Sequence, residues 1–487
     1  MFLESTLNQM KLDYLKRSPF WVLLGSPFIL WFLLKLGNNG VPLLTSDSGA
    51  YLLNARELKV PFDRTIFYSL LMRVFMEMES VGFGVALFNT LLLPFVLFNY
   101  LYFGLNRIVV FKLSRFILLL VYVLALIFTP LPWIFIQIMP DVYTPILGLS
   151  LLHFLMATNT KQAWLYGCIS VFSAIMHNGN LILISVFALL LLGMFLLKKY
   201  SNFAVIKRLF FVVFGGWASV IGSNLIVGHG FTASKASHIF LIAKFAESGL
   251  LKNYLDENCQ SKPNSLCLYK DDLPEHAWDF IWPEQGILSK TGGWHNSKEE
   301  YSRIINGIVT DPYFLVQLMF KSVEATYLQC LVYGAGDGLS KLDEKSTVYT
   351  EVVNHHTFYQ SKINNCFQQK ESIAFSEFNL FYRCCILLAI IIVGFILIKR
   401  FRTRKTSTLL VFAFTFTICN AFATGAFANV IMRLNTRGVI VFEIVLFLIL
   451  IQTLMESTFI NKICSRFKIG ISSNLRSELY ILFSFLI

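Results

Sequence analysis

The sequence predicts an all-α polytopic membrane protein with about ten transmembrane helices, further helices along the membrane interface and a mostly helical insertion on the outer side. Of its 487 residues, 56% are hydrophobic and only 14% are charged, whereas a soluble domain has about 25% charged residues. Several apolar runs approach or exceed the roughly 18 residues that cross a bilayer as a helix. Basic residues gather in short clusters at the ends of these runs, as the positive-inside rule expects of cytoplasmic loops.

Residues 1–227 form the predicted N-terminal transmembrane bundle, with about seven spans. The first span, residues 20–36, follows a basic N-terminus and precedes no small-residue cleavage site, so we interpret it as an uncleaved anchor. The loop at 37–80 is too polar to cross the membrane. Its "FYSLLMRVFMEME" has amphipathic helical spacing and is predicted to lie in the outer interface. The other spans of this bundle are expected at 81–105, 116–136, 142–156, on both sides of "MHNGN" at 176–180, and at 209–227.

Residues 228–378 are predicted to be an extracytoplasmic domain, because the seventh span delivers the chain to the outer side and this polar segment is long enough to be a domain of its own. They hold 18 acidic and 13 basic residues, whereas the remainder holds 11 acidic and 28 basic residues. The net charge of +12 therefore indicates membrane topology rather than nucleic-acid binding. Residues 379–487 are the predicted C-terminal bundle with about three spans and a cytoplasmic tail, so both termini are expected in the cytoplasm. These three spans are expected at 381–398, 408–430 and 439–454.

Cysteine spacing gives one candidate disulfide and no metal motif. Cys259 and Cys267 lie close together in the predicted outer segment, where an oxidising compartment permits a bond between them. The alternative is that the cysteines of this segment are free thiols. The chain contains no CxxC pair and no His/Cys cluster with metal-ligand spacing, so the identity of any metal is left open.

Five ionisable residues from separate parts of the chain lie at the predicted outer ends of spans. Ionisable groups close to hydrocarbon are costly and usually face a cavity or a partner, so we expect these residues to share one site. Each also has a plainer interpretation: the two aspartates could cap helices, the histidine could be a solvated turn residue, and the arginines could reach lipid phosphates. The five residues are Asp47, Asp141, His177, Arg433 and Arg437.

This layout resembles the GT-C superfamily of integral-membrane glycosyltransferases, which use polyprenyl-phosphate-linked sugars. Members carry an essential acidic residue near the start of the first outer loop, and that loop forms helices along the membrane. The stretch "TSDSGAYLLNARELKVPFDRTIFYSLLMRVF" has this position and character, with Asp47 near its start. Asp141 matches a second acidic residue between the third and fourth spans, and Arg433 and Arg437 match basic residues that face the lipid phosphate. The chain departs from the pattern in its insertion after the seventh span and in its lone acidic residue, which Ser46 and Ser48 flank.

The resemblance implies an inverting sugar transfer on the outer face from a polyprenyl-phosphate-linked donor to an acceptor of unidentified class. It makes Asp47 the general base and Asp141 a second catalytic residue, with Arg433 and Arg437 on the donor phosphate. His177, together with Tyr51 and Arg56, is a candidate for positioning the acceptor or substrate. No cofactor is certain; a divalent cation held near Asp141 and His177 is one option.

Two other function classes fit the same composition. One is a transporter or flippase for a lipid-linked or anionic solute, for which charges in mid-span and broken or repeated helices are expected. The other is a non-catalytic envelope scaffold whose outer domain binds another protein. All of these interpretations imply contact with membrane lipids, and none implies binding of nucleic acid. The Phe- and Lys-rich composition favours a bacterial inner membrane.

Overall fold

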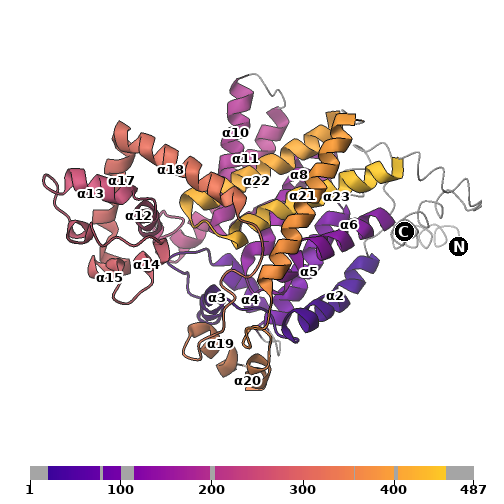
Figure 1. Ribbon diagram of the computed structural model, residues 1–487, viewed down its shortest axis with the longest axis horizontal. Helices are drawn as coiled ribbons and strands as arrows, with labels where there is room; N and C mark the ends of the chain where they lie inside the picture. The colour runs from indigo at the N-terminus through magenta and orange to yellow at the C-terminus, as the bar shows by residue number, and fades with distance from the viewer. Residues whose placement is uncertain are drawn as a thin grey trace, which may run out of the picture.

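The computed structural model describes residues 20–76, 81–99, 115–197, 203–355, 357–399 and 404–456. Within these ranges the chain is helical and contains no strand (Figure 1). One isolated β-bridge in the described residues joins Leu43 to Gln137. The predicted all-α membrane class is therefore confirmed in its coarse form.

In chain order the helices form three groups: a first part, the insertion and a last part. Those of the first part are α2 (Phe20–Asn38), α3 (Ser46–Glu57), α4 (Phe67–Val74), α5 (Val81–Asn99), α6 (Arg115–Phe128), α7 (Leu131–Ile136), η3 (Pro140–Val142), α8 (Tyr143–Met156), α9 (Thr160–Ile175), α10 (Asn178–Leu196) and α11 (Phe203–Ile226). Those of the insertion are α12 (Ser237–Glu247), α13 (Leu250–Asn258), η4 (Ser265–Tyr269), α14 (Ala277–Ile281), α15 (Ile287–Lys290), α16 (Gly293–Asn296), α17 (Lys298–Thr310), α18 (Pro312–Leu331), α19 (Thr347–His355) and α20 (Thr357–Asn364). The last part contains α21 (Phe375–Lys399), α22 (Arg404–Phe427) and α23 (Met432–Glu456).

Five helices of the described chain are long and apolar enough to cross a membrane: α10, α11, α21, α22 and α23. The predicted count of about ten spans is not confirmed, although other helices, among them α2, α5, α8 and α9, occupy the remaining predicted positions. The expected third span, 116–136, is not one helix, because it breaks between α6 and α7 at Pro130. Proline lacks a backbone N–H and restricts the residue before it, so a helix ends there.

Helix α23 is the centre of the bundle. In its most apolar stretch of 18 residues, 89% of the residues are buried. The helix packs against α6, α8, α21 and α22. Its N-terminal end therefore meets the ends of several neighbouring elements. The predicted interfacial stretch forms α3 and α4, which pack against each other near this end.

The insertion has two parts with different cores. Residues of α12 to α17 enclose a hydrophobic cluster of their own, with Ile239, Leu251, Phe280 and Tyr301 among its fully buried side chains. Figure 1 shows these helices as a group beside the bundle. The later part, which includes α19, instead contributes Val348 and its neighbours to the core of the bundle. A disulfide joins Cys259 to Cys267 in the first part.

Candidate functional site

Asp47 lies in the first turn of α3, with its carboxylate between two guanidinium groups. Arg64 Nη1 is 3.2 Å from Asp47 Oδ1, and Arg433 Nη2 is 3.5 Å from Oδ2. The helix cap is Thr45, whose backbone N–H donates to Ser48 Oγ at 2.9 Å, so the interpretation of Asp47 as the cap is wrong. About a third of the Asp47 side chain, 32%, is exposed, which leaves the carboxylate accessible to a ligand.

Asp141 lies in η3 and forms a buried ion pair with α23. Arg437 Nη1 donates to Asp141 Oδ1 at 2.9 Å, and each side chain is only 1% exposed. Arg433 Nε lies 3.7 Å from Asp141 Oδ2. The carboxylate thus faces two arginines one helical turn apart, rather than capping η3. Arg433 connects this buried pair to the more exposed Asp47.

Arg64 and Asp63 belong to the same site, although they were not among the residues predicted from the sequence. Arg64 Nη2 lies 2.5 Å from Asp63 Oδ2, and its guanidinium stands 4.9 Å from the centre of the Tyr51 ring. Tyr51 is only 3% exposed. Its ring therefore contacts the Arg64 guanidinium from the buried side of the site and does not reach a ligand directly. Phe62, which precedes them, accepts backbone hydrogen bonds at its carbonyl from Lys235 and Ala236 of the insertion. The only sequence signal was an Asp-Arg pair directly after "PF" in a polar loop.

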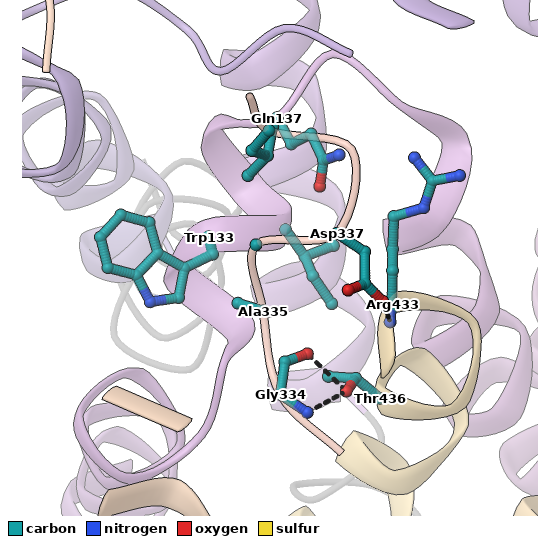
Figure 2. Close-up of a pocket in the computed structure, with 10 residues that line it drawn as sticks. Trp133, Gln137, Gly334, Ala335, Asp337, Arg433 and Thr436 are labelled. Atoms are coloured by element: carbon teal, nitrogen blue, oxygen red, sulfur yellow. Dashed lines mark hydrogen bonds between the residues drawn. The ribbon is translucent and has the colours of Figure 1, made fainter. Parts of the chain in front are cut away.

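The loop after α18 completes the site with a further carboxylate. The backbone N–H of Arg433 donates to Asp337 Oδ2 at 2.9 Å, which caps α23 from a distant segment. Thr436 exchanges two hydrogen bonds with the backbone of Gly334, as Figure 2 shows. The loop is therefore fixed along the first turns of α23. A small pocket between the loop and α7 is lined by Trp133 together with Asp337, Arg433 and Thr436, among others.

His177 and Arg56 occupy the margins of the site. His177 caps α10, since its Nδ1 accepts from the backbone N–H of Gly179 at 2.9 Å. An added Cβ at Gly179 would lie 2.8 Å from Arg437 Nη2, so the missing side chain lets this arginine approach. Arg56 lies at the other end of α3, 3.0 Å from Glu351 of α19. Four of the five expected side chains are therefore joined by ion pairs: Asp47, Asp141, Arg433 and Arg437. His177 lies beside them, and Arg56 lies apart.

The charges of the site determine its protonation. Burial opposes ionisation of Asp47, but Arg64 and Arg433 outweigh it and hold the pKa of its carboxyl below the ordinary value of 3.8. Burial raises the pKa of Tyr51, which stays a neutral phenol. Burial and the nearby Arg437 lower the pKa of His177. Its imidazole is then neutral, and because Nδ1 accepts a hydrogen bond, Nε2 carries the proton.

The site as it stands does not fit a divalent cation. In the part of the chain that the structure describes, no three His, Cys, Asp or Glu side chains are grouped as metal ligands. Of the two residues expected to hold a cation, Asp141 faces the guanidinium groups of Arg437 and Arg433, and His177 uses Nδ1 to accept the Gly179 N–H. Hard cations such as Mg²⁺ prefer several oxygen ligands without competing positive charge.

No protein-family model, curated protein or solved structure matches this chain. The functional interpretation therefore depends on the chemistry of the site itself.

Proposed function

We propose that this chain is an integral-membrane glycosyltransferase of the GT-C kind, which transfers sugar from a polyprenyl-phosphate-linked donor to an acceptor with inversion. The observation that carries the proposal is the part-exposed Asp47 carboxylate between Arg64 and Arg433, at one end of a bundle of apolar helices. A carboxylate beside cations offers a proton acceptor and an anion-binding group within one small site. A lipid-linked phosphate donor needs both at the membrane interface.

The exposure of the side chains suggests a division of roles. Arg433 and Arg64, at 16% and 14% exposed, are accessible to the donor phosphate, and their planar guanidinium groups match phosphate oxygens in pairs. Arg437 and Asp141 are each 1% exposed and act as positioning residues that hold Arg433. The GT-C resemblance assigns the donor phosphate to Arg433 and Arg437, whereas this proposal assigns it to Arg433 and Arg64. It also leaves Asp47 as the single catalytic carboxylate.

Donor binding would then activate the base. With no donor present, Asp47 shares Arg433 and Arg64 and is a weak base because its pKa is low. A donor phosphate that takes one guanidinium removes part of this stabilisation and raises the pKa of Asp47. The carboxylate becomes a stronger proton acceptor only when the donor is in place. It takes the proton of the acceptor hydroxyl as the new glycosidic bond forms and the polyprenyl phosphate leaves.

The proposal includes the finer topology. About ten spans, both termini in the cytoplasm and the site on the outer face of a bacterial inner membrane agree with the charge pattern of the loops. Asp47, Asp141 and the arginine-bearing end of α23 lie at one end of the bundle, which is what a single outer-face site requires. A transporter is expected to carry a charged residue in mid-span, and Glu443 is the candidate. Glu443 accepts a hydrogen bond from Tyr333 and so helps to fix the loop after α18.

The direct test uses the purified full chain in lipid vesicles with a panel of polyprenyl-phosphate-linked sugars. We expect release of polyprenyl phosphate and stoichiometric appearance of the sugar on an acceptor supplied as a membrane extract. Movement of the intact donor between leaflets without sugar release would instead identify a flippase. Absence of both activities, with the chain folded, would contradict the enzyme proposal.

A conservative change at Arg433 tests the phosphate role. We expect Arg433→Lys to raise the donor KM roughly 10- to 100-fold, because it keeps the charge and loses one charge-assisted hydrogen bond of about 1.5–3 kcal/mol. The measurement is the donor concentration dependence of sugar transfer. Arg73→Lys in α4 is the matched control, since Arg73 is exposed and contacts the Arg56 carbonyl outside the site. An equal effect of both variants would rule out a specific phosphate contact at Arg433.

The pH dependence of transfer tests the ionised state of Asp47. Protonation inactivates the base, so the acid limb of kcat/KM lies below the ordinary pKa of 3.8 in the native chain. In Arg64→Gln, Asp47 loses one of the two cations that lower its pKa, while burial still raises that pKa. We therefore expect the acid limb to move to higher pH. The measurement is the pH profile of kcat/KM at low donor concentration for both proteins. A limb that stays in place would assign the titration to another group.

A further inference from the structure

Helix α18 carries a long exposed apolar stripe that the proposed function does not use. Its exposed positions recur three or four residues apart, which places them on one face of the helix over all its turns. The stripe consists of Tyr313, Val316, Phe320, Val323, Tyr327 and Leu331. Such a continuous apolar surface is unusual for a water-facing helix and marks an interaction surface.

The other faces of α18 are occupied in different ways. Phe314 and Gln329 are buried on the face toward the neighbouring helices, and Leu318 packs on the cluster of the insertion. A narrow polar face holds Gln317 beside the Lys321–Glu324 ion pair, whose charged atoms are 3.0 Å apart. The helix is thus divided into a packed face, an apolar face and a polar face.

Helix α18 also lies against the end of the bundle that bears the site. It packs on α22, where an added Cβ at Gly425 would lie 2.6 Å from the Ala325 carbonyl oxygen. The Gln329 amide exchanges two hydrogen bonds with the backbone of Ile431, in the turn between α22 and α23. Because this turn joins two apolar helices long enough to cross a membrane, α18 is held at the level where those helices leave the hydrocarbon.

We propose that α18 lies in the membrane interface and inserts its apolar stripe, from Tyr313 to Leu331, into the lipid acyl chains. Helix α22, on which it packs, is a candidate span and also exposes apolar side chains, namely Val411, Phe414 and Ile418. The polar face with Lys321 and Glu324 then meets the headgroups and water, as in other interfacial helices. A bilayer covers the whole stripe without any further partner.

Membrane contact of α18 has a consequence for the site. The loop that begins at Val332 directly after α18 carries Asp337 to the N-terminus of α23. Asn435 Nδ2 also donates to the carbonyl of Val332. Insertion of α18 therefore fixes one side of this loop at the membrane surface, close to where a lipid-linked ligand would arrive.

The test places spin labels on α18 in the full chain, reconstituted in phosphatidylcholine–phosphatidylglycerol vesicles. The free cysteines are replaced, the Cys259–Cys267 disulfide is kept, and single cysteines are introduced at Val316, Phe320 and Val323. Matched controls carry the label at Gln317, Lys321 and Glu324 of the polar face. We expect oxygen collisions severalfold above nickel-complex collisions on the stripe, and the reverse order on the polar face.

Two results would overturn the proposal. High nickel access on both faces would place α18 in water, and low access of both reagents on the stripe would show that a protein, such as a second copy of the chain, covers it. A measurement on the native sequence avoids the cysteine-replaced background. Cys330 is exposed on α18, and a thiol covered by acyl chains stays protonated and unreactive, so a charged maleimide should modify it far more slowly in vesicles than in the denatured chain, as measured on its own peptide by mass spectrometry. Equally fast modification in vesicles and in the denatured chain would also contradict the proposal.

Discussion

Asp47→Asn is expected to lower kcat for sugar transfer by about 10²- to 10⁴-fold, the range that a positioned general base supplies. Asparagine keeps the size of the side chain and loses the proton acceptor. It also leaves Arg64 and Arg433 without their shared carboxylate, so both become freer to bind phosphate. The donor KM should therefore stay constant or fall while kcat collapses. The measurement is a full kinetic analysis with a polyprenyl-phosphate-linked donor.

The split between kcat and KM separates catalysis from simple charge balance. If Asp47 only orients the arginines, its loss should change the donor KM and leave kcat nearly intact. Glu57→Gln is the matched control, because Glu57 ends the same helix and pairs with Lys59 at 2.7 Å outside the site. We expect that variant to behave as the native chain. Equal kcat in Asp47→Asn and Glu57→Gln would refute the role of Asp47 as the base.

Hydropathy predicted the positions of the five long apolar helices, α10, α11, α21, α22 and α23, because each is a long run of mostly apolar residues. It could not predict where proline would divide such a run, although "TPLP" at 129–132 contained the signal that separates α6 from α7. The N-cap of α3 could also have been predicted from the sequence, since Thr45 and Ser48 have the spacing of a capping box. That signal would have left the Asp47 carboxylate available for another role.

The candidate site was only partly predictable, since topology gives the side of the membrane and not the distance between residues. Asp47, Asp141, Arg433 and Arg437 meet because α3 and η3 pack against the start of α23. Arg56 was selected with them but lies nine residues along α3 from Asp47, about 13 Å away along the helix axis.

Arg64 and Asp337 were missed for a different reason. Both stand in loops without hydrophobic periodicity, and loop residues approach a site only through tertiary contacts. Arg64 is placed by the loop after α3, which Asn178 Nδ2 fixes through the Asp63 carbonyl at 3.0 Å. Asp337 is placed by hydrogen bonds between its loop and α23. No local pattern in the sequence encodes these contacts.

Removing the buried carboxylate should affect stability more than any other single change in the site. Asp141→Leu leaves Arg437 buried without its partner at 2.9 Å. Breaking a buried ion pair in this way typically costs about 3–5 kcal/mol, because the remaining charge is neither solvated nor paired. We therefore expect the variant to unfold at a markedly lower temperature or denaturant concentration in detergent. Arg433 keeps Asp47, so the destabilisation comes chiefly from Arg437.

The double variant Asp141→Leu/Arg437→Met distinguishes a stabilising pair from a positioning pair. Replacing both charges by apolar side chains of similar volume is often neutral or stabilising by about 1–4 kcal/mol, so stability should return. Transfer activity should not return fully, because Arg433 has lost the Asp141 carboxylate 3.7 Å from its Nε and is less well held. A stable double variant with native kcat and donor KM would show that the pair does not position Arg433. A double variant as unstable as the single one would show that the cost does not arise from an unpaired Arg437.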